Sequence, residues 1–170
     1  GKGVFICDDV EVAKEKLKTL LNGEFGEASK KVLVEQYQKG DEISLISLFD
    51  GETLLPFLYS QDYKRLYENN LGPNTGGMGA YCPVIVEDKY KNQIDEYLKK
   101  LQEALISEKA DFIGFIYSGL ILTYNGIKVL EYNMRLGDPE TQALLTSLKT
   151  DFLKILIYAK NKNLDKIKLK

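Results

Sequence analysis

The amino-acid sequence predicts an α+β fold, a largely antiparallel sheet with helices on one face. Two hairpin signals lead to this prediction. Asp50-Gly51 and Asn125-Gly126 each separate two apolar, β-rich segments, and glycine in such turns tolerates the positive φ that they require. Apolar residues recur at helical spacing between and after the hairpins. Blocks of antiparallel strands and helices are typical of the α+β class.

The first forty residues predict a strand, a helix and a second strand. Residues 4–7 are a short apolar run, and Asp8 with Glu11 reads as a capping box that opens a helix. A loop with two glycines spans residues 22–29, and residues 32–37 have the composition of a strand. The helix is indicated by apolar residues on one stripe: Val10, Ala13, Leu17, Leu20 and Leu21.

The middle of the chain predicts a hairpin followed by a long loop. Residues 43–49 and 53–59 flank the first turn, and residues 60–86 carry four glycines and two prolines without usable periodicity. A stretch this long is usually functional or disordered. The large aromatic side chains of Tyr63, Tyr67 and Tyr81 are untypical of disordered segments, so they favour a functional loop.

The last third predicts two helices around a second hairpin. Residues 88–103 form an amphipathic helix, and residues 112–124 pair with residues 128–133. Pro139 suits the first turn of a helix. Thr150 or Asp151 caps the last helix. The tail at 161–170 is rich in Lys and Asn, and we expect it to lead into a further segment.

The composition excludes several classes of function. The chain has 170 residues, a net charge of −2 and no histidine. The charge argues against a general nucleic-acid or anionic-membrane surface, and no apolar run reaches transmembrane length. Without histidine there is no Ser-His-Asp catalysis and no His-ligated zinc, so any metal must be hard and oxygen-bound, as Mg²⁺ or Mn²⁺ are. Cys7 and Cys82 form no CxxC motif, which indicates a reduced, cytoplasmic protein. Gly1-Lys2-Gly3 leads straight into Val4-Phe5-Ile6 without the apolar core of a signal peptide, so none is expected.

Two carboxylate-bearing segments could bind a metal or a substrate. Glu131 and Asn133 lie two residues apart on a predicted strand and so share a face. They could reach one Mg²⁺, or they could belong to a solvated edge. In the segment after them, Arg135 suits a carboxylate or phosphate, and Asp138 and Glu140 could hold an ammonium or sugar hydroxyls. Alternatively, Asp138 caps the helix that Pro139 opens.

Three other segments are weaker candidates. The glycine-rich stretch at 74–79 allows close backbone approach to a ligand but is not a Walker A motif. Residues 60–65 place a carboxylate beside two cations. This arrangement could bind a charged ligand, or it could be a turn exposed to solvent. Lys2 could contact phosphates. The segment at 35–37, with Glu42 after it, could take adenine and ribose, although spacing alone does not distinguish this from an ordinary link between two strands.

Together these segments resemble the phosphoribosylamine–glycine ligases (glycinamide ribonucleotide synthetases) of the ATP-grasp superfamily. The motifs at 72–83 and 135–142 are specific to this ligase, whereas Glu35 and Glu42 belong to the wider superfamily. The resemblance runs in order through Gly1-Lys2-Gly3-Val4, Val34-Glu35, Gly40-Asp41-Glu42, Leu55-Pro56, Ser60–Arg65, Gly72–Tyr81 with Pro83, Gly114–Leu120 and Glu131–Gln142.

The resemblance implies ATP-dependent ligation of glycine to 5-phosphoribosylamine through glycyl phosphate, with ATP and Mg²⁺ (or Mn²⁺) as cofactors. It implies catalytic roles for Arg135, Asp62 and Lys64, and metal binding by Glu131 and Asn133. The nucleotide would be held by Lys2, Glu35, Gln36, Tyr37 and Glu42. The substrates would be held by Asp62, Lys64, Asn74, Thr75, Gly76, Gly77, Met78, Gly79, Arg135, Gly137, Asp138 and Glu140.

The sequence departs from the family pattern in three respects. Tyr63 stands where many relatives have histidine, and Cys82 replaces a common serine. The third is an expectation, that the family's N- and C-terminal domains and a phosphate-binding lysine lie outside these 170 residues. We therefore expect residues 1–170 to be a partial ATP-grasp domain, incomplete at both ends and inactive alone, against which the remainder of the same enzyme packs. Another ATP-grasp enzyme, or a non-enzymatic binding module, is the alternative.

Overall fold

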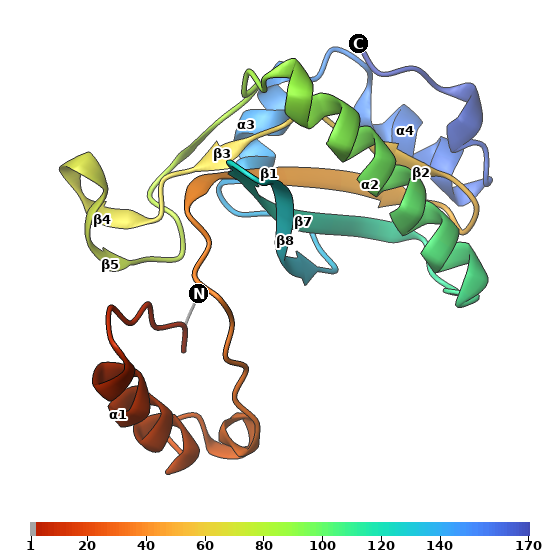
Figure 1. Cartoon of the computed structure of the whole chain (residues 1–170). Coiled ribbons are helices and arrows are strands. Elements are labelled where there is room, and N and C mark those ends of the chain that lie inside the picture. Colours follow the sequence, from red (N-terminus) through yellow and green to blue (C-terminus); the bar gives the residue numbers. More distant parts are fainter. Residues whose placement is uncertain (1–2) are drawn as a thin grey trace. The chain divides into compact units, whose positions relative to one another are not determined.

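The computed structural model describes residues 3–170, and the chain divides into two compact units, Gly1–Gln38 and Lys39–Lys170 (Figure 1). The first unit contains helix α1 (Val10–Leu21) and the short helix η1 (Gly26–Lys30). The helix is predicted correctly, but its N-cap is Asp9, whose carboxylate accepts a hydrogen bond from the Val12 amide at 2.9 Å. The expected capping box at Asp8 is therefore one residue too early.

The two strands predicted in the first unit are wrong. Residues 4–7 and 32–37 have no regular secondary structure. Their composition suits a strand, but a strand also needs a neighbour for its backbone hydrogen bonds, and none of the described residues pairs with either segment. Leu33 and Val34 are accordingly exposed by 78% and 79%.

The second unit is built on a four-stranded antiparallel sheet with the order β2-β1-β7-β8. Both predicted hairpins are confirmed. Gly51 joins β1 to β2 with φ +97°, and Gly126 opens β8 with φ +106°, which are the left-handed values that glycine supplies. The strands are β1 (Gly40–Phe49), β2 (Leu54–Pro56), β7 (Gly114–Thr123) and β8 (Gly126–Asn133).

Helices cover both faces of this sheet, which corrects the expectation of one covered face (Figure 1). Ile43 and Leu45 of β1 pack with Ile94 of α2 (Asp88–Ser107). Ile46 and Leu48 point the other way and pack against α3 (Glu140–Ser147) and α4 (Phe152–Lys160). Side chains along a strand point alternately to the two faces of the sheet. Because β1 has apolar residues on both faces, each face needs a covering layer.

The long loop predicted at 60–86 contains two short antiparallel ladders. Strand β3 pairs with β6, and β4 pairs with β5 around the short helix η2. These strands have two to four residues each, too few for a periodic pattern to emerge. They are β3 (Gln61–Asp62), β4 (Arg65–Tyr67), η2 (Glu68–Asn70), β5 (Leu71–Asn74) and β6 (Ala80–Tyr81).

The C-terminal tail packs on the sheet. Leu164, in the short helix η3 (Leu164–Lys166), and Ile167 are buried in the same core as α3 and α4. The buried Asp50 ties this tail to the first hairpin, because its carboxylate accepts from the Leu164 amide at 3.0 Å. Asp151 caps α4, as one of the two predicted candidates. None of the helices in the described part of the chain is long and apolar enough to span a membrane.

Candidate active site

Backbone hydrogen bonds join the segment at 60–65 to the glycine-rich stretch. The Tyr63 amide donates to the Gly79 carbonyl at 2.8 Å, and the Met78 amide donates to the Tyr63 carbonyl at 2.8 Å. The Thr75 amide and hydroxyl both donate to the Lys64 carbonyl, at 2.7 and 2.8 Å. The two segments, which were separate candidates in the sequence, thus form one structural unit.

Gly77 brings this unit against the segment at 135–140. Its φ is +124°, and a Cβ built there would lie 2.5 Å from Cδ of Pro139 and 3.3 Å from the Asp138 carbonyl oxygen. Real Cβ atoms do not approach this closely, so only glycine fits without a shift. Gly76 and Gly79 have no heavy atom within 4 Å of such a Cβ, and therefore leave open space beside the contact.

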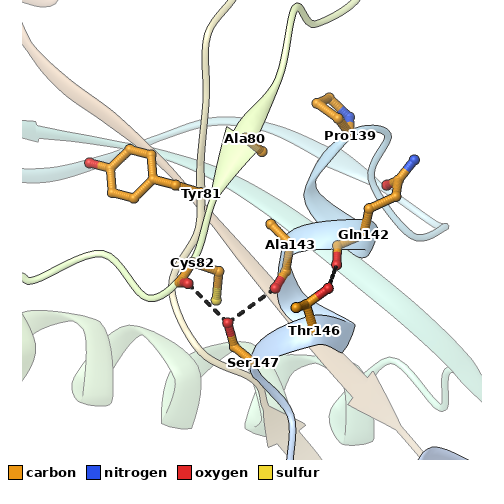
Figure 2. Close-up of a pocket in the computed structure, with 8 residues that line it drawn as sticks. All are labelled: Ala80, Tyr81, Cys82, Pro139, Gln142, Ala143, Thr146 and Ser147. Atoms are coloured by element: carbon orange, nitrogen blue, oxygen red, sulfur yellow. Dashed lines mark hydrogen bonds between the residues drawn. The ribbon is translucent and has the colours of Figure 1, made fainter.

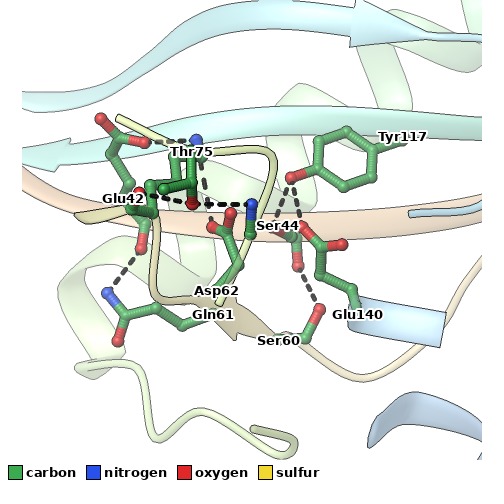
Figure 3. A network of polar contacts seen from close by, with 10 residues as sticks. Glu42, Ser44, Ser60, Gln61, Asp62, Thr75, Tyr117 and Glu140 are labelled. Carbon is green, nitrogen blue, oxygen red and sulfur yellow. Dashed lines mark hydrogen bonds and ion pairs between the residues drawn. The ribbon is translucent and has the colours of Figure 1, made fainter. Parts of the chain in front are cut away.

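Lys64 is the centre of an ion-pair cluster. Its Nζ lies 2.7 Å from Oε2 of Glu42 and 3.9 Å from Oδ1 of Asp62. Asp62 belongs to β3 and its side chain is only 8% exposed, whereas Glu42 on β1 is more open to solvent. Figure 3 shows Asp62 between Glu42 and Glu140, the residue that opens α3. The two predicted catalytic residues of this segment therefore lie together.

Burial and neighbouring charges shift the pKa of both groups. Burial raises the pKa of Asp62 above its usual value, the positive charge of Lys64 opposes this rise, and the negative charge of Glu140 adds to it. For Lys64, burial acts to lower the pKa, but hydrogen bonding and charge from Glu42, with the charges of Asp62 and Glu131, raise it overall. Glu131 on β8 is thus close enough to act electrostatically on this cluster.

Glu140 is buried in a polar network. It is 3% exposed, and its Oε1 accepts from the Tyr117 hydroxyl at 2.8 Å and from the Ser44 hydroxyl at 3.2 Å. The hydroxyls of Ser44 and Tyr117 are themselves 2.7 Å apart (Figure 3). Burial first, and then the charge of Glu140, raises the pKa of Tyr117, so this hydroxyl stays protonated and can donate. The sequence motifs did not predict a site role for Ser44 or Tyr117.

Glu131 and Asn133 share one face of β8, as predicted for a metal site. Ser118 of β7 pairs with Tyr132 between them, and a bulge at Leu130 precedes them. Both offer oxygen donors, and Glu131 is exposed. Among residues 3–170, no three or more Asp, Glu, Cys or His side chains form a metal-ligand group. A carboxylate and an amide oxygen nevertheless fit Mg²⁺, which retains several waters and binds one or two protein groups.

In the turn at 135–138, Arg135 and Asp138 are exposed, whereas Leu136 packs against the core. Arg135 donates to the Leu136 carbonyl at 2.9 Å and to the Asn133 amide oxygen at 3.4 Å. Asp138 accepts from Gln142 at 2.8 Å. The N-cap of α3 is Pro139, without a side-chain cap hydrogen bond. The capping alternative for Asp138 is therefore wrong, and Pro139 lies one position before the helix that it was expected to open.

The remaining predicted residues are distributed over both units. Asn74 and Met78 are exposed beside the residues just described, and Gly137 packs against Tyr117, whose Cε2 lies 2.9 Å from a Cβ built on the glycine. In the first unit, Glu35, Gln36 and Tyr37 lie exposed in an extended segment, whereas Glu42 belongs to the second unit. Lys2 lies outside the described residues.

A shallow pocket of about 440 Å³ lies between β6 and α3 (Figure 2). Pro139 connects it to the site, and the Ser147 hydroxyl donates to the Cys82 carbonyl at 2.9 Å on its floor. Sequence reasoning selected only residues with charged or glycine-rich motifs and missed most of this lining, which is small or neutral. The lining residues are Ala80, Tyr81, Cys82, Pro139, Gln142, Ala143, Thr146 and Ser147.

Comparison with known proteins identifies relatives along the whole chain. Phosphoribosylamine–glycine ligase of Clostridium acetobutylicum is 42% identical over 167 residues, which are 96% of this chain and 40% of that protein. The enzyme of that name from Listeria innocua is 42% identical over 173 residues, 100% of this chain and 41% of its own length. The chain thus spans about two fifths of the length of these curated relatives.

Solved structures agree with the sequence relatives. The crystal structure of phosphoribosylamine–glycine ligase from Thermotoga maritima matches with a TM-score of 0.82 and 34% identity, over 95% of this chain and 42% of that one. L-amino acid ligase from Bacillus licheniformis, 15% identical over 89% of this chain and 37% of its own, shares the fold with a TM-score of 0.61. A family model described as phosphoribosylglycinamide synthetase, ATP-grasp (A) domain, matches residues 1–141. The chain belongs to this ATP-grasp family.

Proposed function

We propose that this chain is the central, ATP-grasp part of a ligase that joins glycine to 5-phosphoribosylamine, giving glycinamide ribonucleotide, ADP and phosphate. The observation that carries the proposal is the convergence of residues 60–65, 74–79 and 137–140 in one place, through Tyr63–Gly79 hydrogen bonding and the Gly77–Pro139 contact. This convergence supports the assignment of the specific motifs of the resemblance to one site.

The proposed reaction has two balanced steps and needs no protein nucleophile. A glycine carboxylate oxygen attacks the γ-phosphorus of ATP, and ADP leaves, which gives glycyl phosphate. The amine of 5-phosphoribosylamine then attacks the carbonyl carbon, loses a proton, and expels phosphate. Both steps develop negative charge on phosphoryl oxygens, so positioning and charge neutralisation dominate the catalysis.

Glu131 and Asn133 are the proposed Mg²⁺ ligands (Mn²⁺ being the alternative). The ion would supply positive charge at the transferring phosphoryl group. Arg135 lies beside this pair, since it donates to Asn133. Its guanidinium has donors left that can hold an anionic oxygen of glycine or of the phosphoryl group.

Asp62 and Lys64 are proposed to act at the acceptor end. The Asp62 carboxylate, nearly enclosed and next to the loop at 74–79, is suited to hold the attacking amine and receive its proton, because its raised pKa makes it a better base than an exposed aspartate. Lys64 balances part of the local negative charge. Asn74–Gly79, with Gly137 and Asp138, would enclose the substrates.

Glu35, Gln36, Tyr37 and Glu42 are proposed to hold adenine and ribose, with Lys2 on the phosphates. In the 170-residue chain the segment at 35–37 is exposed and belongs to no sheet. We therefore expect this chain by itself to bind Mg-ATP weakly and to show no sustained turnover, with the remainder of the same enzyme packing against it in the active protein.

Glycine-dependent ADP release by the natural protein that contains this sequence tests the proposal. We expect ADP release only with glycine, 5-phosphoribosylamine and Mg-ATP together, and glycinamide ribonucleotide as the product detected by mass spectrometry. Replacement of glycine by alanine or bicarbonate should reduce the rate to background. Turnover with another acid, or none with glycine, would refute it.

A further inference from the structure

We propose that Tyr117 and Ser44 are positioning residues for the substrate turn, acting through Glu140, which itself does not touch substrate. This inference rests on the proposed function for its catalytic consequence. It assigns roles to two residues outside the set expected to bind ligands, and it changes the expected role of Glu140 from substrate binding to support.

The first argument is burial. Glu140 is 3% exposed, and one of its oxygens already accepts hydrogen bonds from two hydroxyls, at 2.8 Å from Tyr117 and 3.2 Å from Ser44. Its other oxygen, Oε2, is directed at the backbone of Gly137, where no Cβ would fit. Oε1 is therefore satisfied by protein donors, while Oε2 packs beside Gly137.

The second argument is where the network is anchored. Ser44 lies on β1, two residues after Glu42 and therefore on the same side of the strand. Tyr117 lies on β7, directly opposite Asn133 of β8. Glu140 opens α3 immediately after the turn at 135–139. The network thus fixes that turn to the two central strands, β1, which carries the proposed ribose ligand Glu42, and β7, which pairs with the strand of the proposed metal ligands.

The third argument is the cost of this arrangement. A buried carboxylate is expensive unless hydrogen bonds satisfy it, and a hydrophobic residue would fill the same space more cheaply. Unlike a hydrophobic side chain, the carboxylate is held in one orientation by its hydrogen bonds. Gly137 packs against both Glu140 and Tyr117, and its carbonyl accepts from the Thr141 amide at 3.2 Å. The turn between the substrate-facing Asp138 and the core is thereby held in one conformation.

Tyr117→Phe tests this, because it removes one hydroxyl and leaves the ring in the core. We expect hydrogen exchange to increase in peptides covering residues 136–145, with protection of β1 and β7 unchanged. In the natural protein that contains this chain, we also expect kcat/KM for glycine to fall about tenfold, as for a lost charge-assisted hydrogen bond, while KM for ATP stays within about twofold. Tyr124→Phe is the matched control, since Tyr124 is 98% exposed.

Two further variants separate support from direct binding. Glu140→Gln keeps an oxygen that can accept from both hydroxyls, so it should retain most activity, whereas Glu140→Ala should lose it. Tyr117→Phe should add little to the defect of Glu140→Ala, because residues that act through one another are not additive. Additive effects, or Glu140→Gln as damaging as Glu140→Ala, would overturn the proposal.

The exchange measurement keeps this inference separate from the proposed function. If the wild-type protein shows no glycine-dependent turnover, the proposed function fails, and hydrogen exchange in Tyr117→Phe still decides whether the network holds the turn. Unchanged exchange at 136–145 in that variant would overturn the inference even in an active ligase.

Discussion

Lys64 faces more negative charge than it can balance. Glu42 and Asp62 both lie within 4.0 Å of its ammonium group, and Glu131 is close enough to raise its pKa. An excess of carboxylates favours a cation in the same region, which agrees with a site for Mg²⁺ and for an amine substrate. The Lys64–Glu42 pair is partly exposed, and ion pairs of this kind contribute little to folding.

Asp62→Asn should reveal the cost of burying this carboxylate. Because the pKa of Asp62 is raised in the folded protein, the folded state keeps a proton that the unfolded state releases, from the ordinary Asp pKa of about 3.9 up to the raised value. The free energy of unfolding of the wild type should therefore fall through this window as pH rises. The variant lacks this loss, so its stability relative to wild type should increase with pH.

Urea unfolding of both proteins between about pH 4 and pH 7 checks this prediction. Asp165→Asn, at an exposed position, is the control and should run parallel to wild type. Parallel curves for Asp62→Asn, or a relative stability that decreases with pH, would show that burial does not dominate the titration of Asp62.

Glu131→Gln should weaken metal dependence without affecting the fold. The side chain is exposed on β8, so its replacement by the neutral amide removes charge but little packing. In the natural protein that contains this chain, we expect the Mg²⁺ concentration for half-maximal turnover to rise by about tenfold or more, as one of two protein ligands weakens. The control is Glu103→Gln on α2, whose side chain is 64% exposed. An unchanged Mg²⁺ requirement would exclude Glu131 as a ligand.

At the scale of elements, the first hairpin and the C-terminal tail depend on one buried side chain. Asp50 accepts from the Glu52 and Thr53 amides at 3.0 and 2.7 Å, and from the Leu164 amide at 3.0 Å. Asp50→Ala would leave three backbone donors unpaired and should cost about 3 kcal/mol or more. Asp50→Asn keeps one acceptor oxygen and should lie between alanine and wild type. A loss below about 1 kcal/mol for alanine, in urea unfolding, would contradict this role.

The same elements explain what could be predicted from the sequence. Both hairpins were predictable because Asp50-Gly51 and Asn125-Gly126 act locally through backbone conformation. The strands at 4–7 and 32–37 were wrong because pairing depends on a partner that composition does not reveal. The prediction of helices on one face of the sheet was wrong. The segment from Ile43 to Leu48 has apolar residues pointing to both faces, a pattern typical of a strand buried on both sides.

In the candidate site, too, residues in local motifs were predictable and residues that depend on long-range contacts were not. Asp62, Lys64 and the glycines at 76–79 carry motifs specific enough to select, and the structure brings them together with residues 137–140. Ser44 and Tyr117 were not selected, because an isolated Ser or Tyr on a strand has no local signal. Their importance comes from a contact with Glu140 that spans 96 and 23 residues of sequence, which only the fold creates.

At the scale of the whole molecule, the hydrophobic core lies in the second unit. All buried hydrophobic residues of the described chain fall between Ile43 and Ile167. In the first unit Val4, Leu33 and Val34 are exposed. We therefore expect the second unit to supply the cooperative stability of the 170-residue chain, because apolar burial is the dominant favourable term in folding.

Limited proteolysis of the 170-residue chain checks this expectation. Chymotrypsin should cut first near Leu33 and Tyr37, where the backbone is exposed and unpaired, and leave a resistant product close to Lys39–Lys170. Amides of β1 and β7 should exchange last. Early cleavage within β1, with residues 3–38 intact, would contradict the assignment of the stable core.

The most direct test of the central claim follows oxygen from glycine into phosphate. If the natural protein that contains this chain forms glycyl phosphate, glycine labelled with ¹⁸O in its carboxylate should transfer one labelled oxygen to each phosphate released, in step with glycinamide ribonucleotide. Mass spectrometry of the phosphate measures this transfer. Unlabelled phosphate formed together with the product would contradict the proposed mechanism.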